Sequence, residues 1–228
     1  MIYGLIFTAG KEQRFNSDKP KTLSHYNGTT VLDHNIHILS KYCDEVFVVC
    51  SNDNKSFFKQ YNTIVIDSGY GCGDAVLKAL LKTNFEFNDR CFIQWGDCII
   101  DEEVLDGICN IDCTSRVIIP CSFEKNPYVA LNQSDDRVKV SFSKYGEFVE
   151  EGYHDFGLFY CNPSYLFPNL VLLHSSIYIN EQYVHRHGNE MQFLDVFNDT
   201  DTNGIIIAIE NIVPKSFNTE YELKNIRQ

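Results

Sequence analysis

The chain has 228 residues, of which 44% are hydrophobic and 14% aromatic; this favours one large folded core and argues against intrinsic disorder. Its 31 acidic and 19 basic residues give a net charge of −12, which argues against a long nucleic acid or an anionic membrane as a partner. No apolar run approaches the roughly 20 residues of a membrane-spanning helix, and the apolar N-terminus is too short for a secretory signal. We therefore expect a cytoplasmic protein whose nine scattered cysteines are reduced.

The first half of the chain alternates strand and helix patterns. Strands are expected at 2–7, 45–50, 63–66, 91–95 and 116–121, and helices at 31–42, 74–82 and 102–111. Such alternation is typical of an α/β fold with a mainly parallel sheet covered by helices on both faces.

The second half shows a change to antiparallel patterns. Two strands at 128–132 and 137–142 flank a polar turn and predict a hairpin. A strand at 155–161, a helix at 190–197, a strand at 204–209 and a C-terminal helix at 219–227 follow. Because no linker composition interrupts the chain, we expect a single domain over residues 1–228 with a mixed sheet.

The loop after the first strand is locally cationic. Residues 1–30 have a net charge of +2, which leaves −14 for the rest of the chain. The basic residues there are Lys11, Arg14, Lys19 and Lys21, against Glu12 and Asp18. Backbone N–H groups of a small-residue turn at the carboxyl end of a strand can bind an anion, and basic side chains can add to this. The alternative is a solvated surface loop.

The order of residues in this loop resembles the signature of nucleotidyltransferases with a glycosyltransferase-A-like (GT-A-like) fold, which include the sugar-1-phosphate nucleotidyltransferases. Their Leu-Ala-Ala-Gly-x-Gly-x-Arg, followed by Pro-Lys, reads here Phe7-Thr8-Ala9-Gly10-Lys11-Glu12-Gln13-Arg14, then Pro20-Lys21. The resemblance implies a Rossmann-like three-layer sandwich in which Arg14 and Lys21 are catalytic and neutralise phosphate charge. By the same resemblance the nucleotide contacts Thr8, Ala9, Gly10 and Lys11. Glu12 replaces the family's second glycine and leaves the shape of the turn open.

Two further motifs follow in the family's order. Gly69-Tyr70-Gly71-Cys72-Gly73 resembles a glycine segment whose backbone lies against the nucleobase, so Gly71, Cys72 and Gly73 are expected to line the base pocket. A simple tight turn is the alternative, with Asp74 as a helix cap. The strand ending in Gly96-Asp97 resembles the site of a magnesium-binding aspartate, so we expect Asp97 to hold Mg²⁺, with Mn²⁺ as the alternative ion.

The C-terminal segment 213–223 resembles the family's closing motif. By that match Asn218 is the second metal ligand, although asparagine is also a good helix N-cap. Asp101 is better placed to cap the helix that follows it. Lys215 is either a phosphate contact or a surface residue.

The acceptor-binding part, about 122–228, resembles the family less than the nucleotide-binding part, about 1–121. We expect Lys144 to meet a phosphate, and Glu151 and Asp155 to contact the acceptor. Segment 170–187 would suit an acceptor lid or the surface of a homodimer. His185-Arg186-His187 could bind a phosphate, but we expect a solvated loop.

The resemblance implies transfer of a nucleoside monophosphate from a nucleoside triphosphate to a sugar phosphate or other small phosphorylated metabolite, with release of pyrophosphate. CTP is the preferred donor, and cell-surface glycan, capsule polysaccharide or lipid synthesis the expected context. One alternative is a GT-A-type glycosyltransferase, although its usual Asp-x-Asp is absent, because Asp97 is followed by Cys98-Ile99. The other alternative is a non-catalytic nucleotide-binding sensor, for which Glu12 is the best argument.

Overall fold

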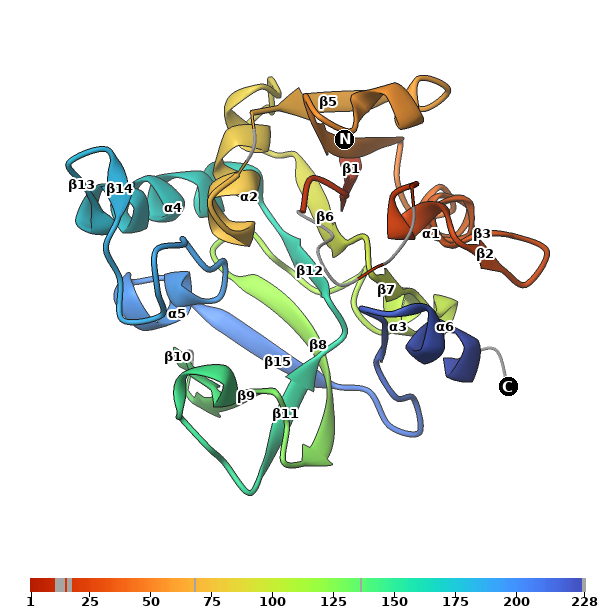
Figure 1. The fold of residues 1–228 in the computed structure, drawn as a ribbon. Coiled ribbons are helices and arrows are strands. Elements are labelled where there is room, and N and C mark those ends of the chain that lie inside the picture. Colours follow the sequence, from red (N-terminus) through yellow and green to blue (C-terminus); the bar gives the residue numbers. More distant parts are fainter. Residues whose placement is uncertain (11–14, 16–17, 68, 136, 227–228) are drawn as a thin grey trace.

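A ten-stranded mixed sheet forms the centre of the computed structural model, which describes residues 1–226 apart from 11–14, 16–17, 68 and 136 (Figure 1). Its strands are β1 (Ile2–Phe7), β4 (Glu45–Ser51), β5 (Thr63–Ile66), β6 (Arg90–Trp95), β8 (Val117–Lys125), β9 (Val129–Ser134), β10 (Arg137–Phe142), β11 (Glu151–Asp155), β12 (Leu158–Cys161) and β15 (Gly204–Ala208). The neighbour order is β10-β9-β11-β8-β12-β6-β1-β4-β5, with β15 also paired to β8.

The sheet is parallel where the sequence alternates strands and helices. Strand β1 pairs in parallel with both β4 and β6, and β4 with β5. Phe7 is level with Val49 on one side and Trp95 on the other, so the segments after β1, β4 and β6 leave the same edge. Beyond β6 the strands β12, β8, β11, β9 and β10 pair antiparallel, as the change of pattern predicted.

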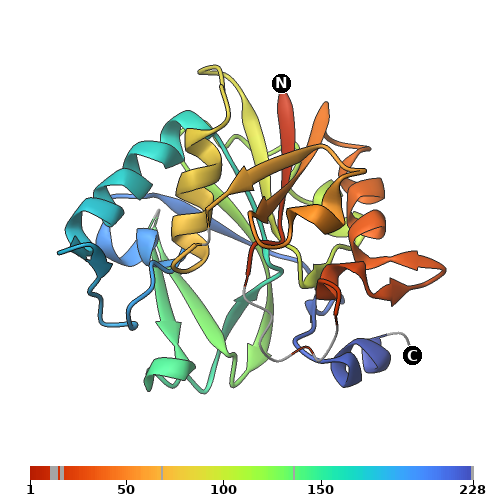
Figure 2. The same cartoon turned by 45° about the horizontal axis from the view of Figure 1, so that its top comes forward.

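Helices cover both faces of the sheet. They are α1 (Val31–Leu39), α2 (Cys72–Leu81), α3 (Glu102–Asp106), α4 (Pro163–Ile177), α5 (Asp195–Asp199) and α6 (Glu220–Ile226). Leu5 and Phe7 of β1 pack into a core with α2, α4 and α5, whereas Ile6 points to a second core with α1 and α3. Figure 2 shows α2 and α4 side by side on one of these faces. The three-layer α/β architecture is therefore confirmed.

Short elements surround the predicted site. They are η1 (Lys21–Leu23), η2 (Lys55–Phe58), η3 (Ser143–Tyr145) and the strand pairs β2 (His25–Tyr26) with β3 (Thr29–Thr30), β7 (Cys98–Ile99) with β16 (Lys215–Ser216), and β13 (Tyr178–Ile179) with β14 (Gln182–Tyr183). A third, smaller core joins Phe15 of the first loop to Ile99, Phe217 and Leu223. It fixes the C-terminal segment beside the first loop.

Three predicted elements differ from the structure, and one helix was not predicted. The expected strand 155–161 is two strands, because Asp155 Oδ1 accepts from the N–H of Gly157 (2.8 Å) and turns the chain. The expected helix 102–111 ends at Asp106. Helix α4 was not predicted: it begins at an Asn162 cap (2.7 Å to the N–H of Ser164), but Pro168 inside it interrupts the helical pattern.

The predicted helix 190–197 is α5, which begins only at Asp195. The N–H of Met191 donates to the carbonyl of Tyr70 (2.8 Å), and the carbonyl of Met191 accepts from Gly73 (2.8 Å). These backbone groups bond sideways to another segment, so they are not available for a helix.

All nine cysteines are free thiols and most are buried, as expected of small core residues. Within the described ranges, no helix combines the length and the apolar composition needed to cross a bilayer.

Candidate active site

The end of β6 is held directly against the end of β1. The N–H of Gly96 donates to the carbonyl of Phe7 (3.0 Å). A Cβ atom at position 96 would lie 2.7 Å from that carbonyl oxygen and 2.8 Å from Cγ2 of Thr22. Only glycine therefore lets this turn approach so closely, and the approach places Asp97 beside the segment that follows the first loop.

Lys21 connects three of the sequence motifs. Its Nζ lies 2.7 Å from Oδ2 of Asp97 and 3.4 Å from the backbone carbonyl of Phe217. The side chain of Lys21 is 15% exposed and that of Asp97 is 31% exposed. The Pro-Lys motif, the Gly-Asp motif and the C-terminal motif thus meet at one ammonium group. The Asp97 carboxylate that pairs with it is partly exposed to solvent.

Phe217, the neighbour of Asn218 in the chain, contacts this site. The N–H of Phe217 donates to the backbone carbonyl of Asp97 (3.0 Å), and the Phe217 ring is fully buried against Phe15 (6.1 Å between ring centroids). The helix cap is Thr219, whose hydroxyl accepts from the N–H of Glu222 (3.2 Å), while the Glu222 carboxylate accepts from the backbone N–H groups of Asn218 and Thr219. Among the described residues, the Asn218 side chain has no hydrogen-bond partner, so it is available as a ligand.

Lys215 and Asp101 pair with each other. The Nζ of Lys215 lies 2.6 and 2.7 Å from the two carboxylate oxygens of Asp101. Asp101 occupies the N-cap position of α3, as expected, but its side chain makes no capping hydrogen bond. This pair ties β16 to the segment before α3 and resembles the Lys21–Asp97 pair in composition, although it lies outside the meeting point of the three motifs.

The first loop is described only in part. Thr8 is buried, and both its N–H (2.8 Å) and its hydroxyl (3.0 Å) donate to the carbonyl of Val49, so its side chain faces β4. Ala9 is half-buried and Gly10 is exposed. Lys11 and Arg14 lie outside the described residues.

The glycine loop before α2 has a packing requirement of its own. Gly71 has φ of 102°, and a Cβ there would lie 2.5 Å from the carbonyl oxygen of Met191. A Cβ at Gly73 would lie 2.9 Å from the same oxygen. The sequence suggested that these glycines allow close approach of a nucleobase. The structure gives them a second role, which is to admit the backbone of the 191–193 segment.

Cys72 and Asp74 hold this loop in place. The Sγ of Cys72 accepts from the N–H of Phe193 (3.2 Å), and burial raises the pKa of the Cys72 thiol to about 11. Asp74 is the third residue of α2, and its carboxylate accepts from the N–H of Tyr70 (2.9 Å) and from the hydroxyl of Tyr183 (2.7 Å). The alternative of Asp74 as the helix cap was wrong, because Gly71 occupies the cap position of α2 and no side chain makes a capping hydrogen bond there.

Among the described residues, no hydrogen bond or ion pair joins the three predicted acceptor residues to one another. The Nζ of Lys144 lies 5.0 Å from the ring centroid of Tyr145, and a hydrogen bond to Tyr145 is the main cause that raises the pKa of Lys144. Glu151 is exposed, whereas Asp155 is buried, and burial raises its pKa, with the Asp97 charge adding to the rise. Within the described part of the chain, no hydrogen bond or ion pair joins Lys144 or Glu151 to Lys21 or Asp97.

His185 and His187 do not belong to a solvated loop. The His187 side chain is 1% exposed and the His185 side chain is 7% exposed, and both face the fully buried Asp195. The expectation of a solvated loop was therefore wrong for these two histidines. A His-x-His pair followed eight residues later by an aspartate was the only signal in the sequence.

Comparisons with known proteins show the family of the chain. Residues 4–136, more than half of the chain, match the family model of the MobA-like NTP transferase domain. The bifunctional protein GlmU of Ruthia magnifica subsp. Calyptogena magnifica is 32% identical over 101 residues, which cover 42% of this chain and 22% of that protein. GlmU of Buchnera aphidicola subsp. Schizaphis graminum (strain Sg) is 30% identical over 130 residues, which cover 54% of this chain and 28% of that protein. The chain thus matches less than a third of the length of these relatives.

Solved structures share the whole fold at low identity. The inositol-1-phosphate CTP transferase from T. maritima has a TM-score of 0.74 at 13% identity and covers 96% of this chain and 90% of its own. A putative glucose-1-phosphate thymidylyltransferase from Bacillus anthracis has a TM-score of 0.75 at 14% identity, with 100% and 94% covered. The CTP:phosphocholine cytidylyltransferase from Streptococcus pneumoniae has a TM-score of 0.71 at 11% identity, with 99% and 97% covered. At these identities the likeness shows the fold alone.

Proposed function

Because the chain belongs to the family of MobA-like NTP transferase domains, we propose that it is an enzyme that transfers a nucleoside monophosphate from a nucleoside triphosphate to a small phosphorylated acceptor. The observation that carries this proposal is the meeting of three motifs at Lys21, whose ammonium group lies at the carboxyl edge of β1 and β6. Ligands of open α/β sheets bind at this edge. The remaining site residues are assigned from the resemblance.

The reaction needs no protein nucleophile. An anionic oxygen of the acceptor phosphate attacks the α-phosphorus in line, the bond to the bridging oxygen breaks, and pyrophosphate leaves. The residues of the chain must align the two phosphates and offset the negative charge. Lys21 donates to Asp97, and a bound triphosphate would give its ammonium group a further anionic partner. Arg14 supplies a second cation in the same loop.

Asp97 and Asn218 suit a hard divalent cation. Their side chains offer carboxylate and amide oxygens, the donor atoms that Mg²⁺ takes from proteins, and the Asp97 carboxylate is exposed enough to accept one. The Asp97–Phe217 backbone bond keeps the two residues together. Bound Mg²⁺, or Mn²⁺ in its place, supplies Lewis-acid neutralisation of phosphate charge.

Two of the structural neighbours support CTP as the preferred donor, because they are a CTP transferase and a CTP:phosphocholine cytidylyltransferase. We assign the base to Gly71, Cys72 and Gly73 and the phosphates to 8–11. The acceptor, a sugar phosphate or other small phosphorylated metabolite, would meet Lys144, Glu151 and Asp155. Synthesis of capsule polysaccharide, another cell-surface glycan or a lipid is the context that we propose.

The test is pyrophosphate release with Mg²⁺, each of the four common nucleoside triphosphates, and pooled sugar phosphates and small phospho-metabolites. We expect release with one triphosphate, CTP, and one acceptor pool. Lys21→Ala should abolish most of it, whereas Lys215→Ala, which breaks the other lysine–aspartate pair, should retain it. Tight, metal-dependent nucleotide binding with no turnover in any pool would instead indicate the sensor alternative. Equal losses in the two variants would remove Lys21 from the site.

A further inference from the structure

Two histidines and an aspartate converge between β14 and α5, at the blue left-hand side of Figure 1. His185 and His187 follow β14, and Asp195 is the first residue of α5. One nitrogen of each histidine and one carboxylate oxygen all lie within 4.8 Å of one another. None of the proposed catalytic residues belongs to this cluster.

One oxygen of Asp195 is left without a donor. The side chain is fully buried, and its Oδ1 lies 2.8 Å from Nδ1 of His187. Its Oδ2 has no hydrogen-bond partner among the described residues. Nδ1 of His185 lies 3.3 Å from this oxygen, but its lone pair accepts from the backbone N–H of His187 (3.2 Å), so this nitrogen does not donate to Oδ2. A buried carboxylate oxygen without a donor is unfavourable unless a cation satisfies it, and the Arg186 guanidinium lies 3.9 Å from the other oxygen, Oδ1.

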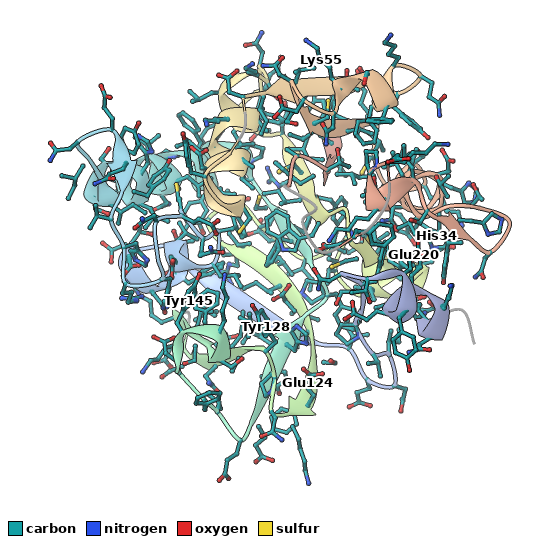
Figure 3. All side chains as sticks on the ribbon, viewed as in Figure 1. His34, Lys55, Glu124, Tyr128, Tyr145 and Glu220 are labelled. Carbon is teal, nitrogen blue, oxygen red and sulfur yellow. The ribbon has the colours of Figure 1, made fainter. Side chains whose placement is uncertain are left out.

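The outer nitrogens of both histidines face further carboxylates. Nε2 of His185 lies 3.0 Å from Oδ2 of Asp199, and Nε2 of His187 lies 3.3 Å from Oε1 of Glu147. Histidines that bind metals usually donate their second ring N–H to a carboxylate in this way, which orients the ring. The ring of Tyr145, labelled in Figure 3, also stacks on His187 with centroids 4.7 Å apart.

We propose that His185, His187 and Asp195 form a binding site for a transition-metal ion of the zinc class, separate from the magnesium site assigned to Asp97. Two imidazoles and one carboxylate are a ligand set that suits zinc. The ion takes the place of the proton between His187 and Asp195, satisfies Oδ2, and replaces the His187 N–H at the Nδ1 lone pair of His185. Three protein ligands leave one coordination position, and an open surface hollow lined in part by His185, Arg186 and Asp199 adjoins the cluster at His185.

The ion would fix the segment that supports the glycine loop. Residues 187–195 form a short loop whose two ends carry ligands. The middle of that loop bonds to the glycine loop, through Met191 to Gly73 (2.8 Å) and through Phe193 to Cys72 (3.2 Å). Metal binding is therefore expected to order both segments together, whether or not the chain transfers nucleotides.

The test is titration of the chelator-treated, full-length protein with Zn²⁺, followed by calorimetry, and with Co²⁺, followed by its absorption spectrum. We expect one equivalent of Zn²⁺ to bind and to raise the melting temperature. His187→Gln should weaken binding by about 100-fold or more, because it removes a ligand. His185→Gln, which changes a less buried ligand, gives the same test if His187→Gln does not fold.

Two matched variants serve as controls. His154→Gln breaks a histidine–carboxylate pair outside the cluster (2.8 Å to Glu124), and Asp97→Asn alters the proposed magnesium site. Both should bind Zn²⁺ like the wild type. Absence of stoichiometric binding, unchanged binding in both cluster variants, or a thiolate charge-transfer band with Co²⁺ would overturn the proposal. The last outcome would assign the metal to cysteines. None of these readouts depends on nucleotidyl transfer.

Discussion

The contact between Gly96 and β1 makes a prediction that can be worked from distances. In Gly96→Ala, the new Cβ would lie 2.7 Å from the carbonyl oxygen of Phe7 and 2.8 Å from Cγ2 of Thr22. Cβ atoms essentially never come that close, so the end of β6 must move. Because one of the two neighbours is backbone in the middle of the sheet, the movement falls on the turn that carries Asp97.

Overpacking of this kind costs about 1–3 kcal/mol of unfolding free energy. Reduced entropy of the unfolded chain returns about 0.4–1 kcal/mol. We therefore expect a net loss of about 1–2 kcal/mol, which for a chain of this size lowers the melting temperature by about 2–8 °C. Displacement of Asp97 should also reduce kcat/KM for pyrophosphate release by about 10–100-fold, because misplacement by about 1 Å costs that much.

Gly10→Ala is the control for stability. A Cβ at Gly10 meets no described atom within 4 Å, so only the entropy term applies and the melting temperature should stay level or rise slightly. Both variants are measured by thermal and urea unfolding. If Gly96→Ala melts no lower than Gly10→Ala, the close approach of β6 to β1 is not what requires a glycine there.

Three further predictions concern single side chains. Lys21→Ala should lower kcat/KM for pyrophosphate release by about 10²-fold or more with a melting temperature within a few degrees of wild type, since a partly exposed ion pair contributes at most about 1 kcal/mol; a large loss of stability with normal kcat/KM would contradict its role. Tyr183→Phe should cost about 1.5–3 kcal/mol in urea unfolding, because it removes a buried donor from the Asp74 carboxylate; a loss under 0.5 kcal/mol would show that this bond does not hold the loop. Burial raises the pKa of Asp155 above 3.8, so the folded state favours its protonated form and the wild type loses stability as the pH rises from 3.8 through that raised pKa. Asp155→Asn keeps an acceptor for Gly157 and lacks this loss, so its stability relative to wild type should increase from acidic to neutral pH; parallel curves would refute the assignment.

The sequence predicted the elements whose patterns are local. The strands of the parallel half are short β-branched runs, and helix α1 begins at a threonine whose hydroxyl accepts from the N–H of Asp33 (3.0 Å). The failures have non-local causes. The pattern of residues 190–194 predicts a helix, but the backbone hydrogen bonds of Met191 to the glycine loop prevent it. The pattern of α4 does not predict a helix because it contains Pro168, although tertiary packing stabilises the helix.

The same distinction between local patterns and non-local contacts applies to the site residues. Lys21 and Asp97 could be predicted because each belongs to a recognisable motif that follows a strand. The parallel pairing of β1 with β6 places the ends of those two strands side by side. The role of Asp195 could not be predicted. That role depends on the burial of its side chain and on one carboxylate oxygen without a donor, and the residue type alone reveals neither. The cap of α6 could be predicted only in part. Both Asn218 and Thr219 are residue types that suit the position, and the hydrogen bond from the N–H of Glu222 to the Thr219 hydroxyl decides between them.

The part of the chain beyond residue 136 completes a site whose motifs lie mostly before it. The family model ends at residue 136, yet the backbone of Phe217 accepts from Lys21 and donates to Asp97, and Met191 and Phe193 bond to the glycine loop. Segments beyond residue 136 therefore contact both the base-binding part and the phosphate-binding part of the proposed nucleotide site. One of these late segments carries the proposed metal cluster and contacts the glycine loop, and the other carries Asn218 and contacts Asp97. Loss of the first should therefore weaken binding of the base, and loss of the second should weaken binding of the phosphates. A chelator should then weaken base recognition in Asp97→Asn as much as in the wild type, because that variant leaves the His185 cluster intact.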